Sequence, residues 1–349
     1  MLELHRVRGI PVLGIAHTGQ VPRSVLGRAT CDEAGRVFSL AEQIEHKLAV
    51  IQALVPAGAL LHLFGHSVGT YICLQLVDRL ENPSVLHSNP ALFHVQTSNC
   101  ERRQSHSGEC LLSTTQSDVD SAPSAKSHDC EPTYTIERCY LLCPTFERIA
   151  ESTSGRMLTA LSKSARCFSA MLALLGVLHL LVPRRLRYLL LSLYFSVGEF
   201  KFRRALRRRR VRAAAESPSE ISESPKVAAL RALHPLAFEA SVRIPECVRR
   251  GCEQLVAEEW GPMRCGLHMG ADEMRAIGPL SARHAELLAQ PRFLQLHAHS
   301  DHWSAPEPTS IPGARSLMDP TNTLEHAFVF HSGAQVVHLV DMIESNHLI

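Results

Sequence analysis

Apolar residues near the beginning of the chain form one short run, followed by one stretch of helical periodicity. Residues 11–16, Pro-Val-Leu-Gly-Ile-Ala, lie between polar and glycine positions, which is typical of a buried parallel strand. From Leu40 to Leu54 the apolar residues recur at intervals of three and four, and Ser39 and Glu42 have the spacing of a capping box. We therefore predict a strand over 11–16 and a helix that begins after Ser39 and ends before the Pro-Ala-Gly of residues 56–58.

Further apolar runs along the chain predict more strands and helices. Leu60 to Phe64 is a second strand candidate, and it leads through a glycine turn into a helical stretch from Thr70 to Leu80. Residues 136–143 and 293–297 are the next strand candidates, and residues 333–344 have the pattern of a closing helix. Because strands alternate with helices, the sequence predicts an α/β protein with a mostly parallel sheet flanked by helices.

Two segments lack the apolar residues that a packed core needs. Residues 82–135 are rich in Ser, Thr, His, Asn and Asp, and such a composition predicts a disordered polar insertion. Residues 213–225, rich in Ser, Glu, Pro and Ala, have the character of a linker. The chain has 349 residues and 45% hydrophobic content, enough to bury a full core. We therefore expect a single domain over residues 1–349 that carries both segments.

Cysteine usage and charge exclude several classes of protein. The 11 cysteines are an odd number without C-x-x-C pairs, which favours a reducing compartment over a disulfide framework. Cysteines and histidines of the polar insertion match no metal-ligand spacing: Cys100, Cys110, Cys130, His94, His106 and His128. A net charge of +2 gives no reason to expect nucleic acid, and the N-terminus lacks the order of a secretory signal. We expect no metal, no cofactor and no nucleic-acid partner.

The most apolar region lies in the middle of the chain, over residues 157–212. Its two apolar runs, 171–182 and 189–197, are each too short to span a bilayer, and residues 201–212 contain eight Lys or Arg. One interpretation is a lipid-docking region whose cations meet anionic headgroups. The other is a helical lid whose leucines cover the active site while the arginines are solvated. Residues 263–269 depart from strand alternation and also fit such a lid.

A candidate nucleophile lies in the turn Gly65-His66-Ser67-Val68-Gly69, between a predicted strand and a predicted helix. A serine hydroxyl is a poor nucleophile unless an imidazole takes its proton and a carboxylate orients that imidazole. The Gly-x-Ser-x-Gly turn sets the serine in a strained corner where larger flanking residues would clash. We therefore predict Ser67 as the nucleophile, Gly65, His66 and Gly69 as the elbow, and the backbone N–H of Val68 as an oxyanion donor.

The partners of Ser67 are expected in the chain order acid, then histidine. Asp301 follows the strand candidate at 293–297, and His326 comes 25 residues later, an interval that fits one helix and one strand. On the alternative interpretation, His326 is simply a surface histidine, one of the 20 histidines in the chain, and Asp301 is an aspartate that forms a turn. Two other aspartates compete for the role of the acid: Asp272 and Asp319.

Several motifs together resemble the lipid droplet-associated hydrolase family, a branch of the α/β-hydrolases. They are residues 43–51 before the elbow, residues 65–73 through it, and the stretch Pro-Thr-Phe-Glu-Arg-Ile-Ala-Glu-Ser within residues 142–152. The likeness continues through residues 300–303 and through the segment His-Ala-Phe-Val that begins at His326. The Pro-Thr-Phe-Glu stretch is the most specific of these, because hydrolases in general have no chemical need for it.

The resemblance implies an α/β-hydrolase with a helical lid and a Ser-Asp-His triad. It implies a carboxylic ester hydrolase of lipid esters, with cholesteryl esters as a candidate substrate, that acts in lipid storage and turnover. It also implies docking through residues 171–212 on lipid droplets or the endoplasmic reticulum, at the cytosolic face.

The chain departs from the family pattern at its beginning. The family's first strand and its Gly-rich loop have no counterpart, so we expect N-terminal strands to be missing and only residues 17–19 to remain as a source of a second oxyanion donor. The alternative function is therefore a lipid-droplet surface-binding protein with weak or no hydrolase activity.

Overall fold

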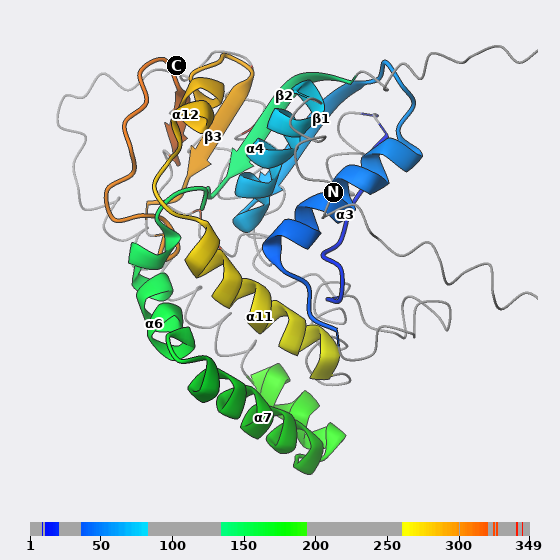
Figure 1. Ribbon diagram of the computed structural model, residues 1–349, viewed down its shortest axis with the longest axis vertical. Coiled ribbons are helices and arrows are strands. Elements are labelled where there is room, and N and C mark those ends of the chain that lie inside the picture. The colour runs from blue at the N-terminus through cyan, green and yellow to red at the C-terminus, as the bar shows by residue number, and fades with distance from the viewer. Residues whose placement is uncertain are drawn as a thin grey trace, which may run out of the picture.

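The computed structural model covers the whole chain and describes its residues over 9, 11–20, 36–82, 134–193, 260–299, 301–319, 324, 326, 340 and 344. Within these residues, four strands form one sheet with helices packed around it (Figure 1). Residues 83–133 of the predicted polar insertion, the basic run at 201–212, the linker and most of the predicted closing helix lie outside the described residues. The predicted end of the insertion is wrong by two residues, because Tyr134 is buried and Thr135 begins a strand.

The sheet is entirely parallel and its strands follow one another in chain order. The strands are β1 (Leu60–His66), β2 (Thr135–Leu142), β3 (Phe293–His297) and β4 (Arg315–Met318). Parallel pairing brings all four carboxyl ends to one edge of the sheet, so the loops that follow the strands lie near one another. The predictions of the first three of these strands are confirmed, whereas β4, with only four residues and partial burial, was not predicted.

The two faces of the sheet bury alternate residues of β2. Tyr140 and Leu142 pack on one face with Leu296. Cys139 and Leu141 pack on the other face with residues of two helices, α4 (Val68–Glu81) and α12 (Ala282–Leu288). This alternation follows from the period of two along a strand. Because both faces are covered there, the second half of β2, residues 139–142, is apolar and buried, as is typical of a strand inside a parallel sheet.

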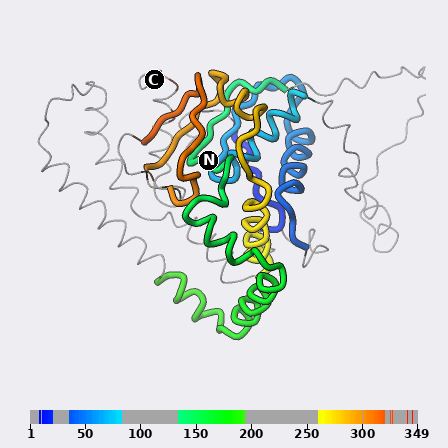
Figure 2. The backbone as a smooth tube through the Cα atoms, turned by 60° about the vertical axis from the view of Figure 1, so that its left-hand side comes forward, coloured from blue at the N-terminus to red at the C-terminus, as the bar shows by residue number. Residues whose placement is uncertain are grey.

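Helices surround the sheet and extend away from one end of it (Figures 1 and 2). They are α3 (Leu40–Leu54), α4 (Val68–Glu81), the 3-10 turn η5 (Ile149–Glu151), α6 (Thr153–Ser162), α7 (Ala165–Leu181), α11 (Trp260–Ala276) and α12 (Ala282–Leu288). Residues 184–193 are also helical. Residues 263–269, expected to belong to a helical lid and not to the sheet, are helical and lie within α11, while the lid itself stays a prediction.

Helix α3 has the bounds that its sequence predicts. Ser39 accepts a hydrogen bond from the Glu42 backbone N–H at 3.2 Å, and the Glu42 carboxylate accepts one from the Ser39 N–H at 2.8 Å. The helix buries a stripe of Leu40, Ile44 and Leu48, each at most 3% exposed, and each such side chain contributes about 1.5–3 kcal/mol of transfer free energy.

The predicted strand at residues 11–16 is wrong, because these residues form no strand pairing and Leu13 is exposed. Side chains of α3 hydrogen-bond backbone groups in and just after this segment, which a neighbouring strand would bond if the segment lay in a sheet. Lys47 Nζ donates to the Ala16 carbonyl at 3.4 Å, and the Gln43 side chain bonds both the N–H and the carbonyl of Thr18. Apolar character alone therefore did not identify a strand here.

Helices α6 and α7 carry the apolar middle region away from the sheet. Among the described helices, none is by itself long and apolar enough to cross a membrane. Only α6 and α7 taken as a pair, with a 96° bend between them, reach that length and composition.

Candidate active site

A single residue turns the chain from β1 into α4. β1 ends at His66 and α4 begins at Val68, and Ser67 between them has φ 55° and ψ −129°. A positive φ costs a non-glycine residue about 1–3 kcal/mol, so the surrounding structure must hold it. The Ser67 N–H donates to the Leu142 carbonyl at 3.1 Å, and Thr70 donates to the Ser67 carbonyl through its N–H at 2.9 Å and its hydroxyl at 2.6 Å.

The two glycines of the turn are not equivalent. A Cβ at Gly65 would lie 2.5 Å from the carbonyl oxygen of Gly69 and 2.8 Å from the backbone nitrogen of Thr70. A Cβ at Gly69 would meet no such neighbour within 4 Å. The sequence argument that glycine is needed at both flanks therefore holds sterically at Gly65 alone.

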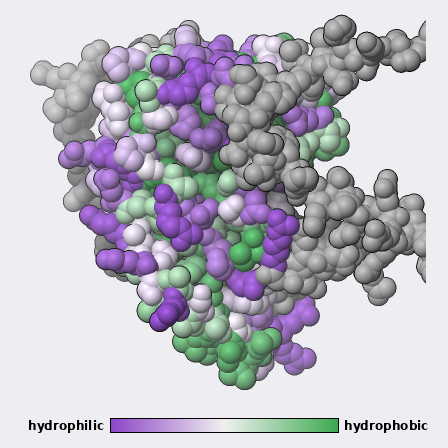
Figure 3. Space-filling view, viewed as in Figure 1, coloured by the Kyte–Doolittle hydropathy of each residue, from purple (hydrophilic) through white to green (hydrophobic). Residues whose placement is uncertain are grey.

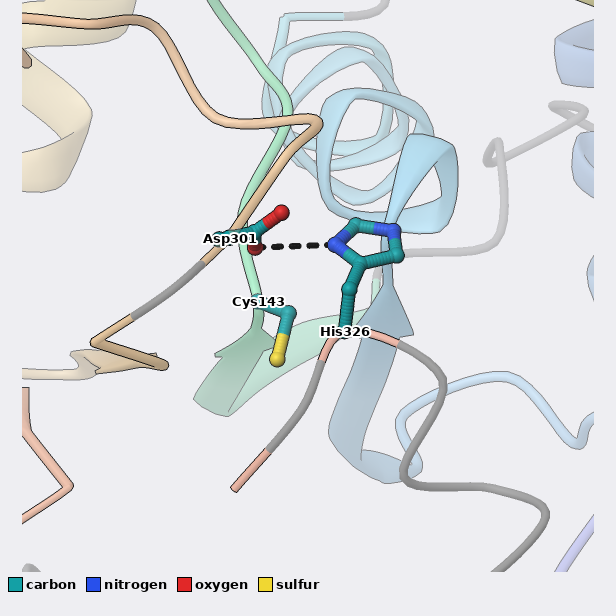
Figure 4. A group of neighbouring side chains, drawn as sticks. All are labelled: Cys143, Asp301 and His326. Carbon is teal, nitrogen blue, oxygen red and sulfur yellow. Dashed lines mark hydrogen bonds and ion pairs between the residues drawn. The ribbon is translucent and has the colours of Figure 1, made fainter. Parts of the chain in front are cut away.

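The three residues expected to share one site do meet. His326 Nε2 lies 2.7 Å from Ser67 Oγ. On the other side of the ring, His326 Nδ1 lies 2.8 Å from Asp301 Oδ2 (Figure 4). Since an ionised carboxylate can only accept, the network assigns the proton of a neutral imidazole to Nδ1 and leaves Nε2 to accept the serine hydroxyl. His326 Nε2 can therefore accept the proton of Ser67, while the Asp301 carboxylate orients the ring through its bond to Nδ1.

The Asp301 carboxylate is held by its own loop, directly after β3. Its Oδ1 accepts the backbone N–H of Trp303 at 2.8 Å and that of Ser304 at 3.3 Å. Burial alone would raise the pKa of Asp301, but the hydrogen bond and charge of His326, with the loop contacts, lower it below the ordinary value. Asp301 is therefore ionised at neutral pH.

His66 supports the histidine from the other side, a role that the motif alone did not reveal. Its Nε2 lies 2.6 Å from the backbone carbonyl oxygen of His326, and the two rings lie 5.2 Å apart. Burial lowers the pKa of His66 to about 4, against a raising effect of the bonded carbonyl. His66 is therefore neutral at physiological pH and donates its Nε2 proton to that carbonyl.

The competing aspartates have other contacts. Asp272 on α11 accepts the backbone N–H of Leu40 at 2.7 Å, which satisfies one of the free amides at the start of α3. Asp319, fully buried after β4, accepts the backbone N–H of Leu324 at 2.6 Å. Of these candidates, Asp301 is the aspartate hydrogen-bonded to His326.

The amide that begins α4 has the position expected of an anion donor. Val68 is the first residue of the helix, and the amides of a first helical turn lack acceptors within the helix. The candidate for a second donor is less suitable, because the Thr18 N–H already donates to Gln43 Oε1 at 2.8 Å. Gly19 beside it packs against Phe38 and Cys265.

Comparisons with known proteins agree with the resemblance in the motifs. The family model described as lipid-droplet associated hydrolase matches residues 2–216. A lipid droplet-associated hydrolase of Drosophila melanogaster is 27% identical over 191 residues, which are 54% of this chain and 45% of the relative. The human protein of the same name is 26% identical over 161 residues, 44% of this chain and 34% of its own.

A shorter match is closer in sequence. The lipid droplet-associated hydrolase of Mus musculus is 46% identical over 52 residues, 15% of this chain and 16% of its own. In these three matches the chain spans less than half the length of the curated relative. No solved structure matches the chain. Because the family model covers more than half of the chain, this protein belongs to the lipid-droplet associated hydrolase family.

Proposed function

We propose that this chain is a serine hydrolase of lipid esters with the α/β-hydrolase fold, and that Ser67, His326 and Asp301 are its triad. The observation that carries the proposal is the continuous hydrogen-bonded path from Ser67 Oγ through the His326 ring to Asp301. The strained turn at Ser67 and the order of the three residues along the chain support it.

The chemistry follows from these contacts. Ser67 Oγ forms a bond to the ester carbonyl carbon while its proton passes to His326 Nε2. The Val68 N–H, at the start of α4, donates to the oxygen that becomes negative. His326 then gives the proton to the departing alcohol as the C–O bond breaks, and water hydrolyses the acyl-serine by the same route. Asp301 stabilises the imidazolium throughout.

The helices beyond the sheet favour a lipid substrate. On α7 and residues 184–193, large apolar side chains are exposed: Leu174, Val177, Leu178, Leu180, Leu181, Leu186, Leu189, Leu190 and Leu193. In Figure 3 hydrophobic residues gather at the lower end of the molecule, where Figure 1 places α7. So much contiguous apolar surface is unusual for a protein that meets only water.

We place the lipid-docking surface on this apolar region, defined as residues 171–193, with the cationic residues 201–212 beside it in sequence. Apolar side chains enter the lipid surface, and cations meet anionic headgroups. Each Lys or Arg near the surface contributes about 1 kcal/mol to membrane binding. The names of the relatives, which state association with lipid droplets, support droplets as that surface. The same proposal has three further parts. α6 and α7 act as a lid, the protein also acts at the endoplasmic reticulum, and cholesteryl esters are its candidate substrate.

Active-site labelling tests the enzyme. A fluorophosphonate probe should label the folded full-length chain, and Ser67→Ala should remove the label. Ser162→Ala is the control and should leave labelling unchanged, since Ser162 is the last residue of α6 and its hydroxyl donates to the Thr159 carbonyl of the same helix. If the folded wild type takes no label, or Ser67→Ala labels equally well, the proposed nucleophile is wrong.

A second candidate function is a droplet-surface protein with weak or no hydrolase activity. It is favoured by the Thr18 N–H, which donates to Gln43 instead of offering a second oxyanion contact. Loss of one such donor costs about 10²–10³ in rate. In this case droplet binding persists in Ser67→Ala, while ester turnover stays at background in the wild type.

A docking test serves both candidates. Leu180→Glu with Leu181→Glu should release the protein from phospholipid-coated triglyceride droplets. Leu54→Glu is the matched control, because Leu54 is 65% exposed at the far end of α3 and Leu181 is 72% exposed. Equal droplet binding by the double variant and the control would refute the docking surface.

A further inference from the structure

A thiol lies next to the carboxylate and the imidazole of the candidate site. Cys143 comes directly after β2, Asp301 follows β3, and His326 lies beyond β4. One sulfur, one carboxylate oxygen and one ring nitrogen of these residues all lie within 4.8 Å of one another (Figure 4). Three parallel strands thus deliver three different ligand types to one point.

The position of the thiol is fixed by its backbone. Cys143 has φ 47°, its N–H donates to the Leu296 carbonyl at 2.8 Å, and its side chain is fully buried. The side chains of Asp301 and His326 are 3% and 15% exposed. The three groups are therefore almost wholly shielded from solvent, and the imidazole is the most exposed of them.

A thiolate, an imidazole and a carboxylate are the ligands that zinc prefers. Zinc takes four ligands in a tetrahedron at about 2.0–2.3 Å, which separates neighbouring ligand atoms by about 3.5 Å. The sulfur, which lies within 4.8 Å of both other atoms, would need to approach by no more than about 1.3 Å. The Asp301–His326 pair, now 2.8 Å apart, would need to open by about 0.7 Å. Calcium and magnesium prefer oxygen ligands and would not use the thiol or the imidazole.

The charges around the thiol also favour a cation. The carboxylates of Asp301 and Asp319 lie close enough to the Cys143 sulfur for their negative charges to act on it. A divalent cation that takes the place of the thiol proton would offset this negative charge.

We propose that Zn²⁺ binds Cys143 Sγ, the Asp301 carboxylate and a His326 ring nitrogen, with water as the fourth ligand, and thereby reversibly inhibits this protein. The thiol proton passes to solvent, the Nδ1 proton of His326 moves to Nε2 by exchange with solvent when Nδ1 becomes the ligand, and no electron is transferred. Inhibition rests on the proposed hydrolase function, because the ion takes two members of the triad. The binding itself does not, since Ser67 is not a ligand.

The test combines a binding spectrum with an activity measurement on the full-length chain. Co²⁺, as a spectroscopic substitute for Zn²⁺, should give a thiolate-to-metal charge-transfer band that added Zn²⁺ removes. Zn²⁺ should slow fluorophosphonate labelling of Ser67, and a chelator should restore it. The variants are Cys143→Ser and Cys143→Ala, with Cys167→Ser as the control, because Cys167 is exposed on α7.

The expected result is a difference confined to Cys143. Both Cys143 variants should lose the cobalt band and need at least about tenfold more Zn²⁺ for half inhibition, since even an outer contact of a metal site costs 10–100-fold in affinity. The Cys167→Ser protein should behave as the wild type. An unchanged band and unchanged zinc sensitivity in either folded Cys143 variant would overturn the proposal.

Failure of the proposed hydrolase function gives a different pattern. If Ser67 is not a nucleophile, no labelling is seen, but the cobalt band still appears in the wild type and in Ser67→Ala and still disappears without Cys143. A cobalt band that depends on Ser67, or no cysteine-dependent band in any protein, would refute the metal site itself.

Discussion

A buried carboxyl group on α11 makes the stability of this protein depend on pH. Glu273 is 8% exposed, and burial, followed by the negative charge of Asp272, raises its pKa to about 8 from the ordinary 4.5. Between these two values the folded state binds a proton that the unfolded state has released. Stability is therefore fully present below pH 4.5 and is lost as the pH rises toward 8.

The size of the effect follows from the same two values. A shift of 3.5 pKa units is worth about 5 kcal/mol if the whole cost is realised, at 1.36 kcal/mol per unit. Between pH 5 and pH 8 the expected loss is about 2–4 kcal/mol, because part of the titration is already complete at pH 5 and the site relaxes around the charge. Glu273→Gln removes the ionisation with almost no change of shape.

Urea unfolding at pH 5 and pH 8 measures this difference, followed by the fluorescence of Trp260 and Trp303. The Glu273→Gln protein should gain about 2–4 kcal/mol over the wild type at pH 8 and less than about 1 kcal/mol at pH 5. Glu286→Gln on α12, where the side chain is 68% exposed, is the control and should show no pH-dependent gain. A Glu273→Gln effect of equal size at both pH values would show that Glu273 titrates normally and refute the reasoning.

Three further predictions concern the elbow and the first helix. Gly65→Ala should abolish probe labelling, because its Cβ would lie 2.5 Å from a backbone oxygen, whereas Gly69→Ala should label within a few-fold of wild type; equal losses would contradict the packing. His66→Ala should lower kcat about tenfold with little change in KM, since one hydrogen bond to the backbone of His326 is worth about 1 kcal/mol, and His66→Gln should restore part of it if donation is what matters. Ser39→Ala should cost about 1 kcal/mol in urea unfolding by loss of the helix cap, and no loss would mean that the cap is not formed in solution.

Local pattern was sufficient wherever the stabilising contacts are themselves local. The start of the helix from Leu40 to Leu54 was predicted to the residue, and its end to within a residue or two, because its cap and its buried stripe are encoded within it. The strand at β1 and the turn at Ser67 were predicted for the same reason. The chain order, together with the strand candidate before Asp301, favoured Asp301 and His326, which the structure brings within hydrogen-bonding distance, but it left two other aspartates as competitors.

Contacts across long distances in sequence could not be predicted. Residues 11–16 have the composition of a strand, but Gln43 and Lys47 bind the polar groups of the segment around Ala16 and Thr18, and no pattern in the run announces that. β4 is too short for alternation to be recognised. The hydrogen bond from His66 to the carbonyl of His326 joins residues 260 positions apart. The motif therefore placed His66 in the elbow but did not reveal its contact with the histidine.

The choice among the three aspartates shows how geometry completes such a sequence argument. Asp301 and Asp319 each follow a strand of the same parallel sheet, so both reach the edge where a triad acid would lie. Asp319 accepts the Leu324 N–H within the chain that leads to His326, while Asp301 receives the His326 ring itself. One carboxylate therefore contributes to the path of the histidine loop and the other to the orientation of its imidazole. The carboxyl end of β2 contacts the elbow, because the Leu142 carbonyl accepts the Ser67 N–H. The next residue is Cys143, the proposed zinc ligand. A change at this strand end should therefore affect serine reactivity and zinc sensitivity together.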